Sequence, residues 1–301
     1  FSLGADISRD LALNPIFEKE ALERERKVIL EEIKMYHDNP MTYVIEKLKE
    51  LLYEKPFNMS IAGSMKTVSK LSREKILEIY NSAYSTNNMI FSVVGNCKWE
   101  NVLEEAKKFP KIVKHIENIP ILCKNGEIIE KRKGIDQAQE VLGFHMPKLT
   151  DKNKYAAEIF DSILGGGMSS RLFQEVREKR GLCYAIKTSL EMSRDYSYEI
   201  IYAGTVKEKI NEIKEIVLKE IKKLKDLKQS DLNEAKETLI GLRQISKEKC
   251  DSTMIELLQE EIGGNAEDYY NYEENISKVD LNSVRELSKL KGYSFVALVP
   301  D

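Results

Sequence analysis

Apolar and polar positions along the chain follow two periods, one of about 3.6 residues, typical of an amphipathic helix, and one of two residues, typical of a strand. The helical period is clearest in residues 21–36 (ALERERKVILEEIKMY), where Val28, Ile29 and Ile33 mark the apolar side. It also predicts helices at residues 2–13, 40–53, 73–84, 99–109, 151–164, 171–179, 207–227, 230–262, 266–274 and 281–290. Alternation and runs of branched residues predict strands at residues 89–95, 137–146, 183–192, 196–204 and 294–299.

Turn and cap residues separate these elements. Asn14-Pro15 ends the first helix, because a residue that precedes proline is pushed out of the helical region. The run Gly165-Gly166-Gly167 ends the helix at 151–164, and Gly181 ends the helix at 171–179. Ser230 is expected to cap the long helix that follows it.

The order of elements divides the chain into two halves that resemble each other. Residues 110–134 hold two prolines, two glycines and mixed charge, and we place a linker at 116–134, parts of which could pair as strand. Residues 1–115 then form the C-terminal part of a first domain, and residues 135–301 form a second. The first half lacks the strand, helix, helix and hairpin order that opens the second, so it would expose a large apolar face. We therefore expect residues upstream of Phe1 to belong to the fold.

Composition narrows the partners and the compartment. Of the 301 residues, 42% are hydrophobic and 32% are charged, and the net charge of −3 gives no electrostatic reason to expect nucleic acid or an anionic membrane. No apolar run has the length of a membrane span. The four cysteines are widely spaced and form no C-x-x-C pair, as in proteins of a reducing compartment, so we expect a cytoplasmic protein.

Candidate chemistry begins with two carboxylates in the helix at 21–36. Glu25 and Glu32 are seven residues apart, two helical turns, so they point the same way about 10 Å apart. A carboxylate flanked by Val28 and Ile33 is a candidate metal ligand. The same spacing also fits a solvated charged face of a surface helix.

Other motifs favour structural roles. The three glycines at 165–167 lack the spacing of a phosphate-binding loop and follow a helix, which favours a helix stop with close backbone approach. His145 is expected to be a hydrogen-bonded strand histidine and His37 a helix-end cation. The Lys-rich helices are balanced by acidic residues, which favours a solvated face over nucleic-acid binding.

Two stretches together resemble a known family. ERERKVILEEI and GGGMSSRLFQEVREKRGLCYAI are similar to segments of the inverzincin zinc metallopeptidases, the pitrilysin, insulinase and mitochondrial processing peptidase family. The stretches GSMKTVSKLSREKILEIY and NNMIFSVVGN match segments that lie downstream of the first one in that family. The resemblance covers essentially the whole chain. It implies an α+β fold of two related domains, each an antiparallel sheet with helices on one face, which together form half of a chamber.

The resemblance also implies a set of site residues. The family binds Zn²⁺ through two histidines of an H-x-x-E-H motif and a downstream glutamate. The glutamate falls on Glu32, and a supporting acidic position falls on Glu25. The H-x-x-E-H motif is absent, since no two of the three histidines lie four apart, so the Zn²⁺ site is incomplete in this chain. The histidines then lie upstream, on a partner chain, or nowhere.

Two further residues match the family's substrate-binding pair, namely Arg177 and Tyr184. A guanidinium and a phenol can donate hydrogen bonds to a peptide carbonyl that is becoming an oxyanion. The turn at Gly181 joins the end of a helix to the start of a strand and would let the two side chains converge. The alternative is an arginine on a charged helix face and a half-buried strand tyrosine.

Two hypotheses for function arise from the resemblance. In the first, the whole protein is a zinc endopeptidase that cleaves peptides or unfolded segments inside a chamber. In the second, the chain is a non-catalytic partner or peptide-binding subunit of such a peptidase. Because one two-domain unit makes only half a chamber in the similar proteins, both hypotheses imply a homodimer or a heterodimer with a related subunit.

Overall fold

A computed structural model describes all 301 residues of the chain. The chain divides into two compact units. Unit 1 comprises residues 1–35, 61–120 and 249–258, and unit 2 comprises residues 36–60, 121–248 and 259–301. Two helices, α2 (Lys19–Asp38) and α10 (Cys250–Gly263), run through a boundary between these ranges.

Unit 2 is built on one five-stranded sheet with the strand order β1-β5-β2-β4-β3. Its strands are β1 (Glu127–Arg132), β2 (Ala138–His145), β3 (Ala185–Met192), β4 (Ser197–Thr205) and β5 (Ser294–Pro300). The pairs β5-β2, β2-β4 and β4-β3 are antiparallel, and β1 runs parallel to β5 at one edge. The mixture of this sheet with helices confirms the predicted α+β class.

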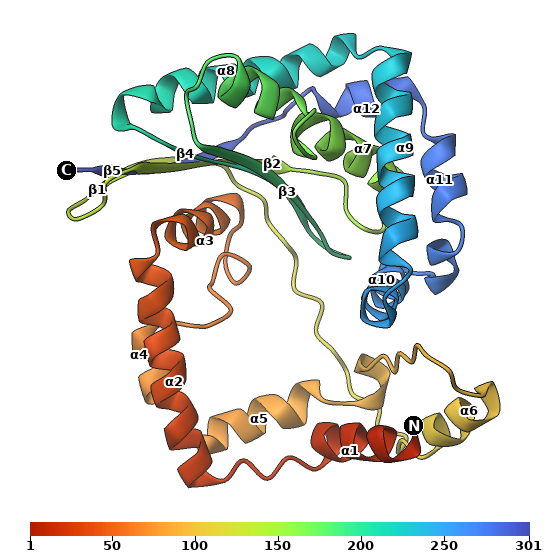
Figure 1. The fold of residues 1–301 in the computed structure, drawn as a ribbon. Coiled ribbons are helices and arrows are strands. Elements are labelled where there is room, and N and C mark those ends of the chain that lie inside the picture. Colours follow the sequence, from red (N-terminus) through yellow and green to blue (C-terminus); the bar gives the residue numbers. More distant parts are fainter. The chain divides into compact units, whose positions relative to one another are not determined.

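The two faces of the sheet bury two separate sets of side chains. Strand β5 sends Phe295 and Ala297 to one face and Val296 and Leu298 to the other, as the two-residue period of a strand requires. The larger core lies between the first face and the helices α7 (Lys154–Gly165) and α8 (Ile210–Lys223). The helix α3 (Pro40–Leu52) covers the opposite face (Figure 1), so helices pack on both faces rather than on one.

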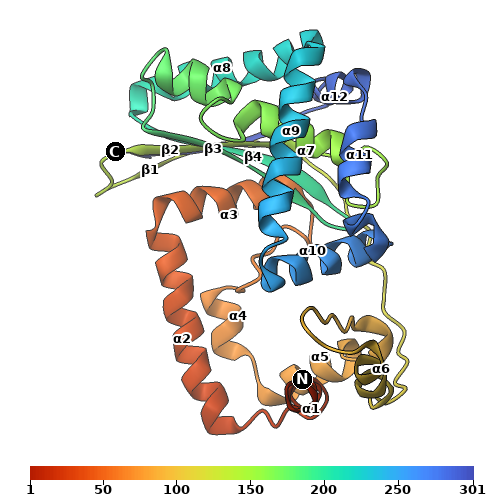
Figure 2. The same ribbon diagram turned by 45° about the vertical axis from the view of Figure 1, so that its right-hand side comes forward.

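The remaining helices of unit 2 extend the larger core. Figure 2 shows α9 (Gln229–Ser246) beside α11 (Tyr272–Lys278), with α12 (Leu281–Leu287) on the side of the sheet that α8 covers. Short helical turns complete this unit: η2 (Phe173–Glu178), η3 (Lys207–Lys209), η4 (Leu224–Asp226) and η5 (Ala266–Tyr269).

Unit 1 is helical and contains no strand. It holds α1 (Ser2–Leu13), most of α2, α4 (Met65–Lys70), α5 (Arg73–Ala83), η1 (Thr86–Asn88) and α6 (Trp99–Lys107). Arginines join these pieces by donating to backbone carbonyls: Arg26 donates to Leu71 over 2.7 Å, and Arg73 donates to Phe17 over 2.7 Å. Glu105 of α6 is buried and bonds Lys108 at 2.8 Å and Arg9 at 3.4 Å.

Several predicted elements need correction. Residues 89–95 form no strand, although their apolar pattern is that of one, because no neighbouring strand is present to pair with their backbone. Ile90 and Phe91 are exposed there. The predicted helix at 230–262 is two helices, α9 and α10, separated at the polar run 247–249. Helix α9 begins at Gln229, and its entry is capped by Asp231, which accepts the Lys228 N–H, and not by Ser230.

The predicted linker at 116–134 does pair in part as a strand, the alternative that its sequence left open. It contains β1, which belongs to the sheet, and residues 36–60 of the predicted first domain cluster with unit 2. The division of the chain into two peptidase-like domains therefore stays a prediction. No helix of the structure combines the length and the apolar character needed to cross a membrane.

Candidate functional site

The two predicted carboxylates lie on the outer surface of α2. This helix buries none of its residues, and both Glu25 and Glu32 are exposed. Neither carboxylate has a hydrogen-bond or ion-pair partner. Glu32 lines a shallow open hollow together with Val28 and Met35, whose side chains are 50% and 58% exposed. The structure therefore places the Glu32 carboxylate beside two exposed apolar side chains and the charged residues Lys27 and Glu31.

The residues of this chain do not by themselves fit a catalytic zinc ion. Such an ion takes three protein ligands, and no group of three histidine, cysteine, aspartate or glutamate side chains is arranged to hold a metal. The nearest histidine in sequence to Glu32, His37, is exposed and lies 3.4 Å from Asp38. No chemical step through a metal follows from these residues alone.

The predicted substrate-binding pair does converge. The guanidinium carbon of Arg177 lies 5.7 Å from the ring centroid of Tyr184. Gly181 makes this possible, because its φ of +59° reverses the chain while its N–H donates to the Arg177 carbonyl over 2.9 Å. Tyr184, the residue before β3, is 82% exposed and has room for a ligand beside it.

The turn that carries Arg177 is not the α-helix that the sequence predicts. Residues Phe173–Glu178 form a π-helix, and the Lys179 N–H donates to the Gln174 carbonyl, five residues back, over 3.0 Å. Short π-helical turns are frequent at functional sites. This wider turn places the Arg177 guanidinium carbon 4.6 Å from the ring centroid of Phe173.

Phe173 is a residue of this site that the sequence interpretation missed. The only signal was an aromatic residue four positions before the arginine in RLFQEVREK. Four residues bring two side chains to one face of a helix. The structure thus assembles three side chains, Phe173, Arg177 and Tyr184, where the sequence identified two.

The charges around Arg177 are distributed unevenly. Glu175 forms ion pairs with Lys179 and with Arg180, the latter at 2.6 Å, and these two cations lower the pKa of Glu175 to about 2. The carboxylate nearest to Arg177 is Glu178, 4.0 Å away, beyond hydrogen-bonding distance. Arg177 therefore keeps its donors free while the neighbouring cations are paired.

The structure confirms the structural roles predicted for His145, a hydrogen-bonded strand residue, and for the glycine run at 165–167, a helix stop. His145 Nε2 lies 3.2 Å from the Lys124 carbonyl, its ring packs on Tyr53, and burial lowers its pKa, which keeps it neutral. The N–H of Gly166 donates to the Ser162 carbonyl, as expected of a helix stop, so this donor is not free for a phosphate. A side chain at Gly165 would overlap Thr188 of β3, which explains the glycine there.

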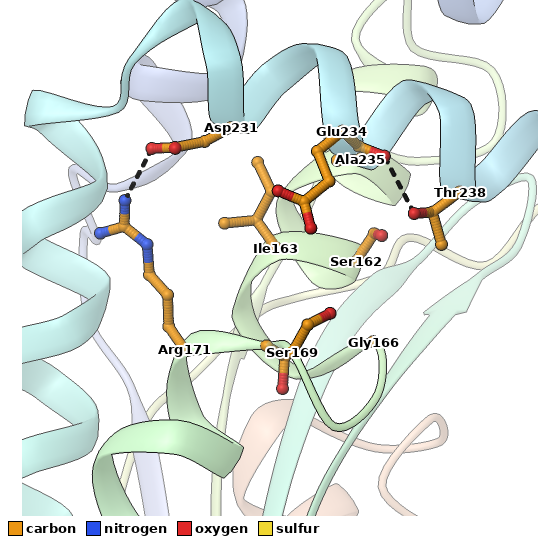
Figure 3. A pocket seen from close by; sticks show the side chains of 10 residues that line it. Ser162, Ile163, Gly166, Ser169, Arg171, Asp231, Glu234, Ala235 and Thr238 are labelled. Atoms are coloured by element: carbon orange, nitrogen blue, oxygen red, sulfur yellow. Dashed lines mark hydrogen bonds and ion pairs between the residues drawn. The ribbon is translucent and has the colours of Figure 1, made fainter.

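A separate polar cavity of about 170 Å³ lies between α7 and α9 (Figure 3). Its charged residues include Arg171, which pairs with Asp231 at 3.3 Å, and Glu234, whose carboxylate points into the cavity. Hydroxyls from Ser162 and Ser169 line it, but none of them bonds a carboxylate or a histidine.

Comparison with known proteins identifies the family. The sequence model described as "Peptidase M16 inactive domain" matches residues 70–239, which is more than half of the chain. The chain belongs to the peptidase M16 family. This confirms the family resemblance inferred from the sequence.

Relatives within the peptidase M16 family carry zinc protease names. An "Uncharacterized zinc protease" of Rickettsia felis is 32% identical over 222 residues, which cover 72% of this chain and 53% of that protein. One of Rickettsia bellii is 30% identical over 264 residues, covering 86% of this chain and 63% of that protein. The chain thus spans between half and two thirds of the length of these relatives.

A solved structure supports the fold. The peptidase M16 inactive domain from Pseudomonas fluorescens superposes with a TM-score of 0.86 over 99% of this chain and 74% of its own, at 19% identity. At that identity the likeness concerns the fold alone.

Proposed function

We propose that the whole protein is a zinc-dependent endopeptidase that hydrolyses peptides or unfolded protein segments within a chamber. Membership of the peptidase M16 family and the zinc protease names of its relatives support the reaction class. The observation that carries the proposal for this chain is the convergence of Arg177 and Tyr184, two hydrogen-bond donors; the ion-pair partner of Arg177, Glu178, is 4.0 Å away and beyond hydrogen-bonding distance.

In this proposal the residues of the chain have distinct roles. Glu32 provides one oxygen ligand to Zn²⁺, and the histidine ligands come from residues outside these 301 or from a partner chain. Glu25 supports the site from the preceding turns of α2. Arg177 and Tyr184 donate hydrogen bonds to a peptide carbonyl, and such donors contribute most when the oxygen gains negative charge. The working form is a homodimer or heterodimer with a related subunit, in the cytoplasm.

A second candidate is a non-catalytic subunit that binds peptides for such an enzyme. The description of the matching family model as an inactive domain favours it. In this case Arg177 and Tyr184 hold an unfolded segment, and Glu32 has no metal to bind.

Hydrolysis of fluorescein-labelled casein by the whole protein tests the two candidates. The endopeptidase proposal predicts that Glu32→Gln abolishes hydrolysis and that Arg177→Ala lowers kcat/KM about 100-fold, the usual cost of one oxyanion donor. Glu31→Gln is the matched control, since Glu31 lines the same hollow and pairs only with Lys34 at the surface.

Three outcomes separate the candidates. Hydrolysis that survives Glu32→Gln at the wild-type rate overturns the endopeptidase proposal for this chain. Casein binding without hydrolysis, lost in the double variant Arg177→Ala and Tyr184→Phe, selects the peptide-binding subunit. If neither binding nor hydrolysis changes when Arg177 and Tyr184 are replaced, both candidate functions are overturned.

A further inference from the structure

The side chain of Arg177 contacts two aromatic rings, and its ion-pair partner Glu178 lies 4.0 Å away, too far to accept a hydrogen bond. Its guanidinium carbon lies 4.6 Å from the centroid of the Phe173 ring and 5.7 Å from that of Tyr184. Both distances fall within the roughly 6 Å range of cation–π attraction. Phe173 is half-buried in the π-helical turn, whereas Tyr184 is largely exposed, so Phe173 is the fixed side of this contact.

This way of holding an arginine leaves its hydrogen-bond donors available. A carboxylate in contact would accept two of the five guanidinium N–H groups in a bidentate pair. A ring face attracts the positive charge without accepting those hydrogens in the guanidinium plane. The surrounding carboxylates fit this arrangement. Glu175 forms ion pairs with Lys179 and Arg180, and the Glu178 carboxylate lies 4.0 Å from Arg177.

We propose that Phe173 is a positioning residue, whose ring fixes the Arg177 guanidinium beside Tyr184 with its donors free for the carbonyl of a bound peptide. The proposal rests on the function proposed above, in which Arg177 and Tyr184 bind substrate. The contact with Phe173 orders the Arg177 side chain before a peptide binds. An arginine on a solvated helix face would lose several rotatable bonds of freedom on binding.

This role requires an aromatic ring at position 173, and an apolar side chain of similar volume would not be enough. A leucine at position 173 would preserve packing against the turn but would remove the quadrupole that attracts the guanidinium. A tyrosine would preserve the ring face. The pair Phe173→Leu and Phe173→Tyr therefore separates cation–π positioning from packing, and Phe173→Met provides a second non-aromatic variant should the leucine variant fail to fold.

The test is binding of fluorescein-labelled casein to the whole protein, measured by anisotropy for each variant. Phe173→Leu and Phe173→Met should weaken binding about two- to fivefold, the value of one exposed cation–π contact. Phe173→Tyr should bind as the wild type does. In the Arg177→Ala background, Phe173→Leu should have no further effect, because the residue through which Phe173 acts is gone.

A second readout needs no ligand. The Nε–H resonance of Arg177, identified by its loss in Arg177→Ala, should carry a ring-current shift that disappears in Phe173→Leu and persists in Phe173→Tyr. An unchanged resonance in Phe173→Leu would overturn the proposal.

The binding outcomes also distinguish this inference from the proposed function. Wild-type binding by Phe173→Leu, or an equal loss with and without Arg177, would overturn the positioning role while leaving the role of Arg177 intact. Wild-type binding by the single variant Arg177→Ala would instead overturn the proposed function of the pair, and the positioning role with it.

Discussion

A buried carboxyl group in the centre of the sheet allows a stability prediction with a defined pH dependence. Glu140 lies on β2, is 3% exposed, and has no hydrogen-bond partner on either carboxylate oxygen. It lines a small hollow with Phe295 and with Lys214, whose ammonium is already paired with Glu127 at 2.7 Å. Burial raises the pKa of Glu140 to about 9, and the charge of Lys214 opposes this only in part.

The size of the stability change follows from the pKa of Glu140 in the folded protein and its pKa in the unfolded chain. Glu140 is protonated in the folded protein at neutral pH but ionised in the unfolded chain, whose carboxyl pKa is near 4.5. Each pKa unit is worth about 1.4 kcal/mol. Folding therefore loses about 3 kcal/mol at pH 7 through this group, a loss that starts as the pH rises through about 4.5 and is complete near 9.

Replacing Glu140 by glutamine removes the titration at nearly constant shape. Glu140→Gln should stabilise unit 2 by about 3 kcal/mol at pH 7 and by less than about 1 kcal/mol at pH 5. Hydrogen exchange of the β2 amides measures this, because it reports the opening of the sheet even when the two units unfold separately. Glu191→Gln, at an exposed position of the edge strand β3, is the control and should change the opening free energy by less than about 0.5 kcal/mol at either pH.

A Glu140→Gln variant that is destabilised, or one whose gain in stability is equal at the two pH values, would refute the predicted cost of burying this carboxyl group. The first result would mean that the carboxyl group makes a contact that an amide cannot replace. The second would mean that its pKa is the same in the folded and unfolded states.

Other substitutions test the packing of unit 2 by the same exchange measurement. Lys154→Met should destabilise it by about 3 kcal/mol, because it leaves the buried Glu260, now 2.6 Å from the Lys154 ammonium, without its partner; a loss below about 1 kcal/mol would contradict this. Gly165→Ala should cost about 1–3 kcal/mol, since the new methyl group would overlap Thr188. Gly241→Ala, where a Cβ meets nothing within 4 Å, should instead stabilise α9 by about 0.5–1 kcal/mol, and equal effects of the two glycine variants would remove the steric argument.

Local patterns were sufficient to predict most of the sheet. The strands β2, β3, β4 and β5 lie within two residues of the predicted ranges. The strands β2, β4 and β5 carry nearly continuous buried runs, and β3 alternates exposed with less exposed residues along most of its length, so each has a local pattern typical of a strand. The strand β1 lies within the predicted linker, where a strand was only an alternative. It is an edge strand with a charged sequence, EIIEKR, and its parallel pairing with β5 depends on residues that are more than 160 positions away.

The opposite error occurred at residues 89–95. Their sequence MIFSVVG has the composition of a strand, but a strand exists only where another backbone satisfies its hydrogen bonds. Pattern within a segment cannot show whether that partner is present.

The sequence predicted one part of the candidate site, the approach of Arg177 and Tyr184, and missed another, the contact with Phe173. Gly181 in the sequence indicated that Arg177 and Tyr184 could approach each other, and the structure brings them together. The π-helical turn and the contact with Phe173 escaped prediction, because six residues are too few for an apolar pattern to distinguish a single π-helical turn from an α-helical one. The roles of Glu25 and Glu32 stay predictions, since exposure on α2 fits a metal ligand and a solvated face equally.

Metal analysis tests most directly whether the carboxylate of Glu32 ligates zinc in the whole protein, as we propose. The whole protein, purified without chelator and analysed by mass spectrometry for metals, should hold one zinc ion per chain, and Glu31→Gln should retain it. Glu32→Gln should lose most of it after dialysis, because removing one of three ligands weakens a catalytic site severely. Zinc that is retained in full by Glu32→Gln, or absent from the whole wild-type protein, would contradict the account.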